Sequence, residues 1–268
     1  MSVQQLLLTG STANITLMQA LTQLSLTTNL QICLDAGDSA SWTGSGKWLD
    51  RSGNGYDFFL GATGTGEATD PTFNGSVGDL LPTAYWSSDG GDYFTYDTTN
   101  ETWMQNLHKN NAVFTIIAFG TLGTGISDIC GTLGDSGSTG MFFANFGNLW
   151  FRVENAGAQV IDKQTSAVAD GTKGMIALSV DESVGSGGGF FYLNGNYKQV
   201  GGSNTFDSTY SSPSAGAATR TLQIGAQGNG VNPMPADAEI VAYAIWSTAL
   251  SKVNLDSIFA LMRVRLGV

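Results

Sequence analysis

KWLDRSGNGYDF, residues 47–58, joins a tryptophan, two aspartates and a glycine-rich turn in one short stretch. Asp50, Ser52 and Asn54 stand at the first, third and fifth positions of the EF-hand pattern, whose oxygen ligands converge on calcium. The match fails at the twelfth position, where Gly61 replaces the bidentate glutamate. Calcium in a loop of another type stays open as one interpretation, because Asp35, Asp38, Asp50 and Asp57 lie nearby in sequence. In the other, SGNG is a turn between two strands, because asparagine and glycine accept left-handed backbone conformations.

Strand patterns follow this turn along the chain. Residues 111–120, NAVFTIIAFG, form a near-continuous apolar run, and residues 174–183, GMIALSVDES, predict a second strand. Residues 147–157, GNLWFRVENAG, alternate instead, so that Leu149, Phe151 and Val153 share one face while Trp150, Arg152 and Glu154 share the other. This alternation predicts a strand with one face toward the core.

A hairpin and two further strands are predicted in the last third of the chain. Asn194 and Gly195 separate two β-rich runs and form the pair that a type I′ turn prefers. Residues 221–227, TLQIGAQ, and residues 238–247, AEIVAYAIWS, supply the two strands.

A helix is expected after the last strand. Ser251 can cap its start, and Gly267 follows its end. Arg263 and Arg265 fall in its last turn, where the helix dipole favours cations. Many strands and one terminal helix indicate a sandwich or jelly roll.

The composition fits one large all-β domain. The chain has 268 residues, of which 42% are hydrophobic and only 12% charged, and it contains 36 glycines. Its net charge of -11 would repel a phosphate backbone, so nucleic-acid binding is excluded. No apolar run is long enough for a membrane span, and no membrane partner is expected. Cys33 and Cys130 are isolated, which favours two buried thiols over a disulfide or zinc site.

The first 34 residues contain no Asp, Glu, Lys or Arg. We expect residues 1–29 to form an uncharged N-terminal arm ahead of a domain that covers residues 30–268. The apolar positions that could serve assembly are Leu6, Leu7, Leu8, Ile15, Met18, Leu21 and Leu24, the last four at roughly helical spacing. Two interpretations stay open: the arm packs on its own domain, or it docks on a neighbouring subunit to cover its apolar surface.

Two sequence features invite an enzymatic interpretation. GDSGS, residues 134–138, resembles a serine-protease nucleophile motif around Ser136, but His108 is the only histidine and lacks the surroundings of a catalytic base. Asp237 and Glu239 share one face of a strand, as a pair of glycosidase carboxylates could. Solvated charges at a strand edge explain the same pair, and we expect no enzymatic activity.

A resemblance adds to these patterns. LDAGDSASWTGSGKWLDRSGNGYDF, residues 34–58, resembles the opening of the concanavalin A-like, laminin G-like jelly rolls of bacterial surface proteins and phage virion proteins. The similarity continues at residues 190–202, 221–230 and 238–258. The chain departs from the family at Asn254, where an acidic residue is usual, and in the longer segment 61–110. The matching loop residues are Trp48, Asp50, Ser52, Gly53, Asn54 and Gly55.

The resemblance implies an all-β, two-sheet jelly-roll sandwich with a short C-terminal helix and an N-terminal arm. It is specific for the fold and weak for function. It implies a non-enzymatic phage virion structural protein, a capsid decoration or a tail or fibre accessory, made in the host cytoplasm and displayed on the virion surface. Its partners would be major capsid or tail proteins, bound through the arm, and further copies of itself in a homo-oligomer. A carbohydrate-binding lectin module and a glycoside hydrolase are the alternatives.

Aromatic residues in glycine- and aspartate-rich segments suggest adhesion to a cell-surface glycan. Exposed rings beside carboxylates and amides are what sugar stacking and hydroxyl recognition require. The expected glycan-binding residues are Trp42, Trp48, Trp86, Tyr93 and Asp92, with Tyr85 and Tyr96 nearby in sequence.

Overall fold

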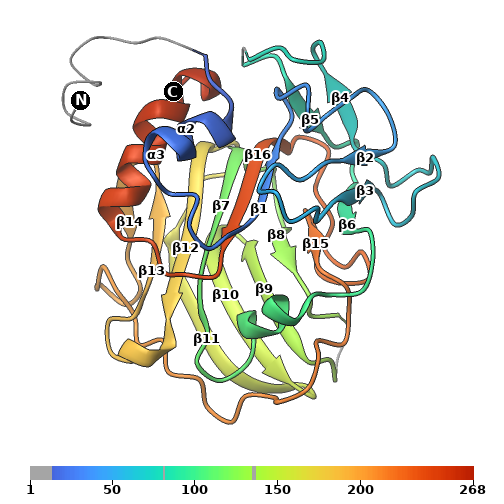
Figure 1. The fold of residues 1–268 in the computed structure, drawn as a ribbon. Helices are drawn as coiled ribbons and strands as arrows, with labels where there is room; N and C mark the ends of the chain where they lie inside the picture. Colours follow the sequence, from blue (N-terminus) through green and yellow to red (C-terminus); the bar gives the residue numbers. More distant parts are fainter. Residues whose placement is uncertain (1–13, 81, 135–136) are drawn as a thin grey trace.

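The computed structural model describes residues 14–80, 82–134 and 137–268, and over these residues it is a sandwich of two antiparallel sheets (Figure 1). Sheet A runs in the order β14 (Asn196–Lys198), β13 (Gly189–Leu193), β12 (Lys173–Asp181), β7 (Val113–Thr121), β16 (Glu239–Trp246), β5 (Tyr85–Ser87) and β4 (Thr72–Asn74), and β1 (Leu30–Asp35) also pairs with β16. Sheet B runs β11 (Ala158–Ala167), β10 (Asn148–Asn155), β9 (Gly140–Asn145), β8 (Ser127–Gly131), β15 (Gln223–Ile224), β6 (Phe94–Tyr96), β3 (Phe58–Leu60) and β2 (Lys47–Trp48). The expected two-sheet sandwich is confirmed.

The main core lies between the two sheets. In β10 the alternation holds as predicted, since Leu149, Phe151 and Val153 are buried in this core. β7 is apolar on both of its faces, for a different reason. Ile116 faces sheet B, whereas Ile117 belongs to a second core on the outer side of sheet A. A strand buried on both faces reads as a continuous apolar run.

Two helices cover the outer face of sheet A (Figure 1). Both begin with a capping box: Thr16 and Gln19 at α2 (Leu17–Gln23), and Ser251 and Asn254 at α3 (Lys252–Leu266). Asn254 is the position where the sequence departs from the family pattern, yet its side-chain oxygen accepts the Ser251 N–H at 3.1 Å. The amide therefore replaces the missing carboxylate in the cap. The described residues also contain two short 3₁₀ helices, Thr102–Leu107 and Glu182–Val184.

The second core decides between the two interpretations of the N-terminal arm for residues 14–29. Leu21 is fully buried in it, and Ile15, Met18 and Leu24 pack against the same cluster. These four residues pack on their own domain, so the expectation that they serve assembly as part of a free arm is wrong. Leu6, Leu7 and Leu8 lie outside the described residues.

Both arginines lie in the last turn of α3 as expected, but their surroundings differ. Arg263 is exposed, but Arg265 is 1% exposed and makes two bonds to Asp35, Nη1 to Oδ2 at 2.6 Å and Nη2 to Oδ1 at 2.8 Å. Asp35 also accepts the backbone N–H of Leu17 at 2.7 Å. One buried ion pair thus joins α3, β1 and the first turn of α2.

Local backbone conformation explains why the predicted hairpin turn is confirmed and why one predicted strand is shorter than expected. Asn194 and Gly195 have φ angles of 47° and 86°, as a type I′ turn requires, and they connect β13 to β14. The predicted strand 221–227 is reduced to Gln223–Ile224, because Gly225 has a φ of 79° and turns the chain out of the sheet.

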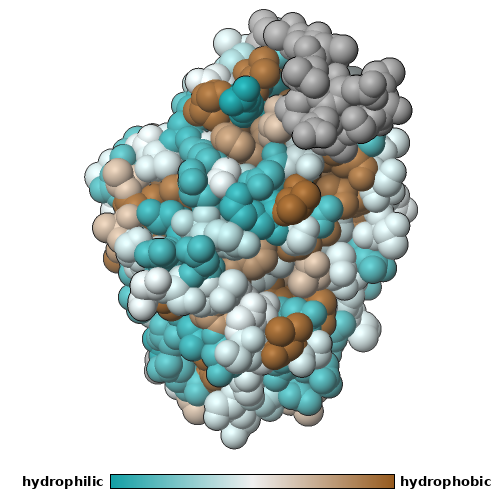
Figure 2. Space-filling view, turned by 90° about the vertical axis from the view of Figure 1, so that its left-hand side faces the viewer, coloured by the Kyte–Doolittle hydropathy of each residue, from teal (hydrophilic) through white to brown (hydrophobic). Residues whose placement is uncertain are grey.

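The side of the molecule that carries α3 and β14 has hydrophobic patches separated by hydrophilic ones (Figure 2). The most exposed apolar residue of α3 is Val253, at 72%, and Val264 is 41% exposed. Among the described residues, no helix is long and apolar enough to cross a membrane.

Candidate functional site

The 47–58 stretch is a loop that fixes the free edge of β1. Asp50 accepts the backbone N–H groups of Cys33 at 2.9 Å and of Gly55 at 3.1 Å, besides those of Ser52 and Tyr56. Asn54 donates its side-chain amide to the carbonyl of Gln31 at 3.0 Å. Since β1 pairs with β16 on its other side, these bonds complete the pairing of an edge strand.

The calcium interpretation of this loop is corrected by the same bonds. The Asp50 carboxylate is taken up by four backbone amides, and the side chains of Ser52 and Asn54 bond the first residues of β1. Across residues 14–80, 82–134 and 137–268, no group of three or more His, Cys, Asp or Glu side chains is placed to hold a metal ion. The motif serves the fold.

The aromatic residues expected to bind a glycan are in the core. Trp48 and Trp86 are fully buried, and Trp42 and Tyr93 are 6% and 8% exposed. The ring centroids of Trp42 and Trp86 are 4.7 Å apart, edge to face, and those of Trp48 and Trp86 are 5.8 Å apart. Rings packed against one another between the sheets cannot stack on a sugar, so this prediction is corrected.

Asp92, expected beside those rings, is 2% exposed and shapes a turn. Its Oδ2 accepts the backbone N–H of Asp89 at 2.9 Å, and burial raises its pKa. A carboxylate used in this way is turned toward the chain and not toward a ligand. The hydroxyl of Tyr96 likewise donates to Glu101 at 2.8 Å inside the fold.

The residues that suggested enzymes are engaged in structural bonds. Asp237 accepts the backbone N–H of Thr124 at 2.7 Å and also its hydroxyl, and these bonds lower the pKa of the carboxyl. Glu239 accepts the hydroxyl of Thr121 at 2.7 Å. His108 is fully buried, with its Nε2 3.1 Å from the carbonyl of Gly216. Ser136 lies outside the described residues.

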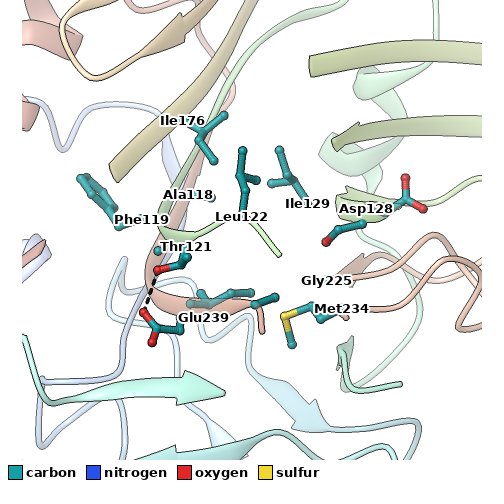
Figure 3. A pocket seen from close by; sticks show the side chains of 14 residues that line it. Ala118, Phe119, Thr121, Leu122, Asp128, Ile129, Ile176, Gly225, Met234 and Glu239 are labelled. Atoms are coloured by element: carbon teal, nitrogen blue, oxygen red, sulfur yellow. Dashed lines mark hydrogen bonds between the residues drawn. The ribbon is translucent and has the colours of Figure 1, made fainter. Parts of the chain in front are cut away.

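A pocket opens between the sheets where β7 ends and β8 begins, with about 390 Å³ of space that includes open solvent. Figure 3 shows Leu122, Ile129 and Met234 around this space, while the Asp128 carboxylate points away from it. The lining is mostly apolar, and of its four polar residues Thr121 and Glu239 bond to each other while the Asp128 carboxylate points away. Such a pocket offers few free polar groups for sugar hydroxyls.

The outer face of sheet B, away from the helices, carries a further set of polar and aromatic side chains. Directly paired residues of antiparallel strands point to the same face, so the register defines one row across the whole sheet. From β11 to β2 this row consists of Asp162, Arg152, Phe142, Gly131, Gln223, Thr95, Phe59 and Lys47. The segment 225–234 covers its middle, since the Gly230 N–H donates to Gln223, which is only 4% exposed.

Trp150 lies at the β9–β11 end of this face and is partly exposed. Its ring contacts Phe142 and Phe146 edge to face, with both centroid distances 5.0 Å. Its Nε1 donates to Asp162 at 2.7 Å. Two ring contacts and one charge-assisted bond hold the indole in a single orientation.

A charge network borders the Trp150 ring. Arg152 lies 5.9 Å from the ring centroid, and its Nη2 is 2.7 Å from Glu154 Oε1. Its Nη1 is 3.9 Å from Asp162 Oδ2, and its buried Nε has no hydrogen-bond partner. We name Trp150, Phe146, Arg152, Glu154 and Asp162 together the Trp150 face. A fixed indole beside carboxylates and a guanidinium can stack on a sugar ring and bond its hydroxyls.

The sequence contains a signal for this face, although the glycan-binding residues expected from sequence all lie in glycine-rich segments. Trp150 is an aromatic residue on the polar phase of a strictly alternating strand, beside Arg152 and Glu154. A large apolar ring on the outward face of a strand, beside charged residues, is an informative exception to the burial of such rings in the core.

The fold is a two-sheet β-sandwich, and comparison with solved structures agrees. No protein-family model matches the chain, and no curated protein matches it by sequence. The receptor-binding domain of botulinum neurotoxin C/D mosaic serotype matches with a TM-score of 0.57 at 11% identity, over 87% of this chain and 51% of that one. The botulinum neurotoxin D ligand-binding domain, solved with N-acetylneuraminic acid, gives 0.56 at 12% identity, over 88% and 52%.

A second kind of structure matches equally well. Trypanosoma rangeli sialidase, in complex with 2,3-difluorosialic acid, gives a TM-score of 0.55 at 15% identity, over 89% of this chain and 33% of that one. The chain thus spans about half of the neurotoxin domains and a third of the sialidase. At these identities the likeness establishes the fold alone.

Proposed function

We propose that the protein is a non-enzymatic, lectin-like component of a virion surface that binds glycans through the Trp150 face. The observation that carries glycan binding is the partly exposed Trp150 ring, fixed by Asp162 and by two aromatic contacts on the outer face of sheet B. Ring stacking and nearby polar groups are the elements of a sugar site. The sandwich is also similar to a domain that was solved with N-acetylneuraminic acid, of which this chain spans 52%.

The Trp150→Ala variant tests glycan binding. On a glycan array, followed by calorimetry with the best binder, we expect the affinity to fall at least tenfold, about 1.4 kcal/mol. Phe59→Ala is the matched control, because Phe59 is an aromatic residue on the same outer face, at the far end of sheet B. If the unmodified chain binds no glycan, or both variants lose binding equally, the Trp150 face is not the site.

The virion role rests on the resemblance of residues 34–58 and 190–258 to modules of phage virion proteins. On this proposal residues 1–13 bind major capsid or tail proteins and support a homo-oligomer. A truncation that begins at Asn14 keeps α2 on sheet A and removes that segment. By light scattering we expect the full chain to oligomerise or bind purified particles and the truncation to do neither. Identical behaviour of the two proteins would contradict the anchoring role.

The absence of catalysis is part of the proposal. A glycosidase acid needs a raised pKa, whereas the bonds from Thr124 lower the pKa of Asp237. The hydrogen bond from Thr121 likewise uses the carboxylate of Glu239 in the fold.

A further inference from the structure

The Trp150 face contains one guanidinium and two carboxylates. Arg152 is 26% exposed in its side chain, Glu154 13% and Asp162 20%, so all three are largely shielded from solvent. Glu154 occupies Nη2 of Arg152 at 2.7 Å, and Asp162 stands 3.9 Å from Nη1. With both acids ionised, the formal charge of the face is -1.

An acidic sugar would meet these groups unfavourably. A sugar carboxylate that bound Nη2 of Arg152 would displace Glu154 and leave a shielded carboxylate without its partner. One that bound Nη1 would lie beside the Asp162 carboxylate, which stands 3.9 Å from that nitrogen. Displacing Asp162 would also release the Nε1 bond that orients Trp150. Any bound anion would lie near the remaining carboxylate, at short range and in a partly desolvated setting. The net charge of -11 on the whole chain adds repulsion at longer range.

An uncharged sugar fits the same groups. Its hydroxyls can donate to the oxygens of Glu154 and Asp162 that Arg152 leaves free, and its ring face can stack on Trp150. We infer that the Trp150 face selects uncharged pyranose glycans and discriminates against glycans that carry a carboxylate or sulfate. This inference rests on the proposed glycan-binding function, and it distinguishes the chain from the neighbour solved with N-acetylneuraminic acid.

The test uses matched glycan pairs on one array, each an uncharged oligosaccharide and its sialylated or sulfated form, with the full chain as probe. We expect the uncharged member to bind at least tenfold more tightly, and we expect the preference to shrink at high ionic strength. The double variant Glu154→Gln, Asp162→Asn keeps oxygen acceptors for Arg152 and Trp150 and changes the formal charge of the face to +1. It should reduce the preference at least threefold, and Glu154→Gln alone should have part of that effect.

The possible failures separate the two proposals. If charged members bind as well as uncharged ones and Trp150→Ala abolishes both, the inference is wrong and glycan binding through this face stands. If no member of any pair binds, the proposed function falls and the inference with it. An unchanged preference in a double variant that unfolds at the same urea concentration as the original chain also overturns the inference.

Discussion

Asp50 belongs to a motif that resembles a calcium loop, but its carboxylate has a structural role. Its carboxylate accepts the backbone amides of residues 33, 52, 55 and 56, so the loop is built around one anion supplied by the chain itself. Hydrogen bonds to a charged group contribute about 1.5–3 kcal/mol each, although they are not additive. The oxygen pattern that resembles a calcium loop is satisfied by N–H donors.

We predict that Asp50→Ala lowers the free energy of unfolding by about 3 kcal/mol, because four backbone amides, that of the buried Cys33 among them, lose their acceptor. Urea unfolding followed by circular dichroism measures this change. Calcium should leave the melting temperature of the unmodified chain unchanged, since a ligand that binds only the folded state would raise it. A calcium-dependent rise that Asp50→Ala removes would restore the metal interpretation.

Asp128 is a residue that the fold stabilises poorly when it is charged. It is fully buried under segment 225–234, its Oδ1 lies 3.4 Å from Gln227 Nε2, and its Oδ2 has no hydrogen-bond partner. Burial raises its pKa well above the ordinary value. The folded state therefore holds the proton more tightly than the unfolded state does, and stability falls as the pH rises from about 4 through the folded-state pKa.

We predict that Asp128→Asn raises the free energy of unfolding at pH 7 by about 1–2 kcal/mol and flattens that decline, because an uncharged amide takes the place of the buried carboxylate. Unfolding in urea at several pH values tests this, with the exposed Asp170→Asn as control. A variant that is less stable than the original chain at neutral pH would show that the charged form is needed.

At the scale of elements, the prediction from sequence succeeded where a strand was long enough to show its period. β10 has eight residues, and its two faces were assigned correctly. β2 has two residues and β5 has three, so no periodicity could show that Trp48 and Trp86 face the core. Their glycine-rich surroundings suggested exposure, but the segments lie across the end of the sandwich with their rings inward. Tertiary packing, which local sequence does not encode, decided the outcome.

The ion pair between Asp35 and Arg265 joins elements that are distant in sequence. We predict that Arg265→Met destabilises the fold by about 3–5 kcal/mol, because it leaves the Asp35 carboxylate buried without its partner. The double variant Asp35→Asn, Arg265→Met should recover part of this loss. Arg263→Met, on the exposed side of the same helix, is the control and should change stability by less than about 0.5 kcal/mol. If Arg265→Met and Arg263→Met lowered the free energy of unfolding in urea equally, the ion pair would not contribute to stability as predicted.

At the scale of the whole molecule, the two sides of the sandwich differ. Sheet A is covered by α2 and α3, whereas sheet B presents the Trp150 face on its outer side. The fold class followed from the strand patterns and the resemblance of residues 34–58. The site did not, because its side chains come together only once β10 and β11 have taken their register. Asp162 and Trp150 meet through that pairing and are 12 residues apart in sequence.

The most direct test of the account is the indole N–H spectrum of the ¹⁵N-labelled chain, which has six tryptophans. The Trp150 signal is identified from a Trp150→Phe variant, and an uncharged oligosaccharide selected on the array is then titrated. We predict a saturable shift of the Trp150 Nε1–H signal, while the signals of the fully buried Trp48, Trp86 and Trp246 stay in place. Binding that leaves the Trp150 signal unmoved would contradict the assignment of the glycan site to the outer face of sheet B.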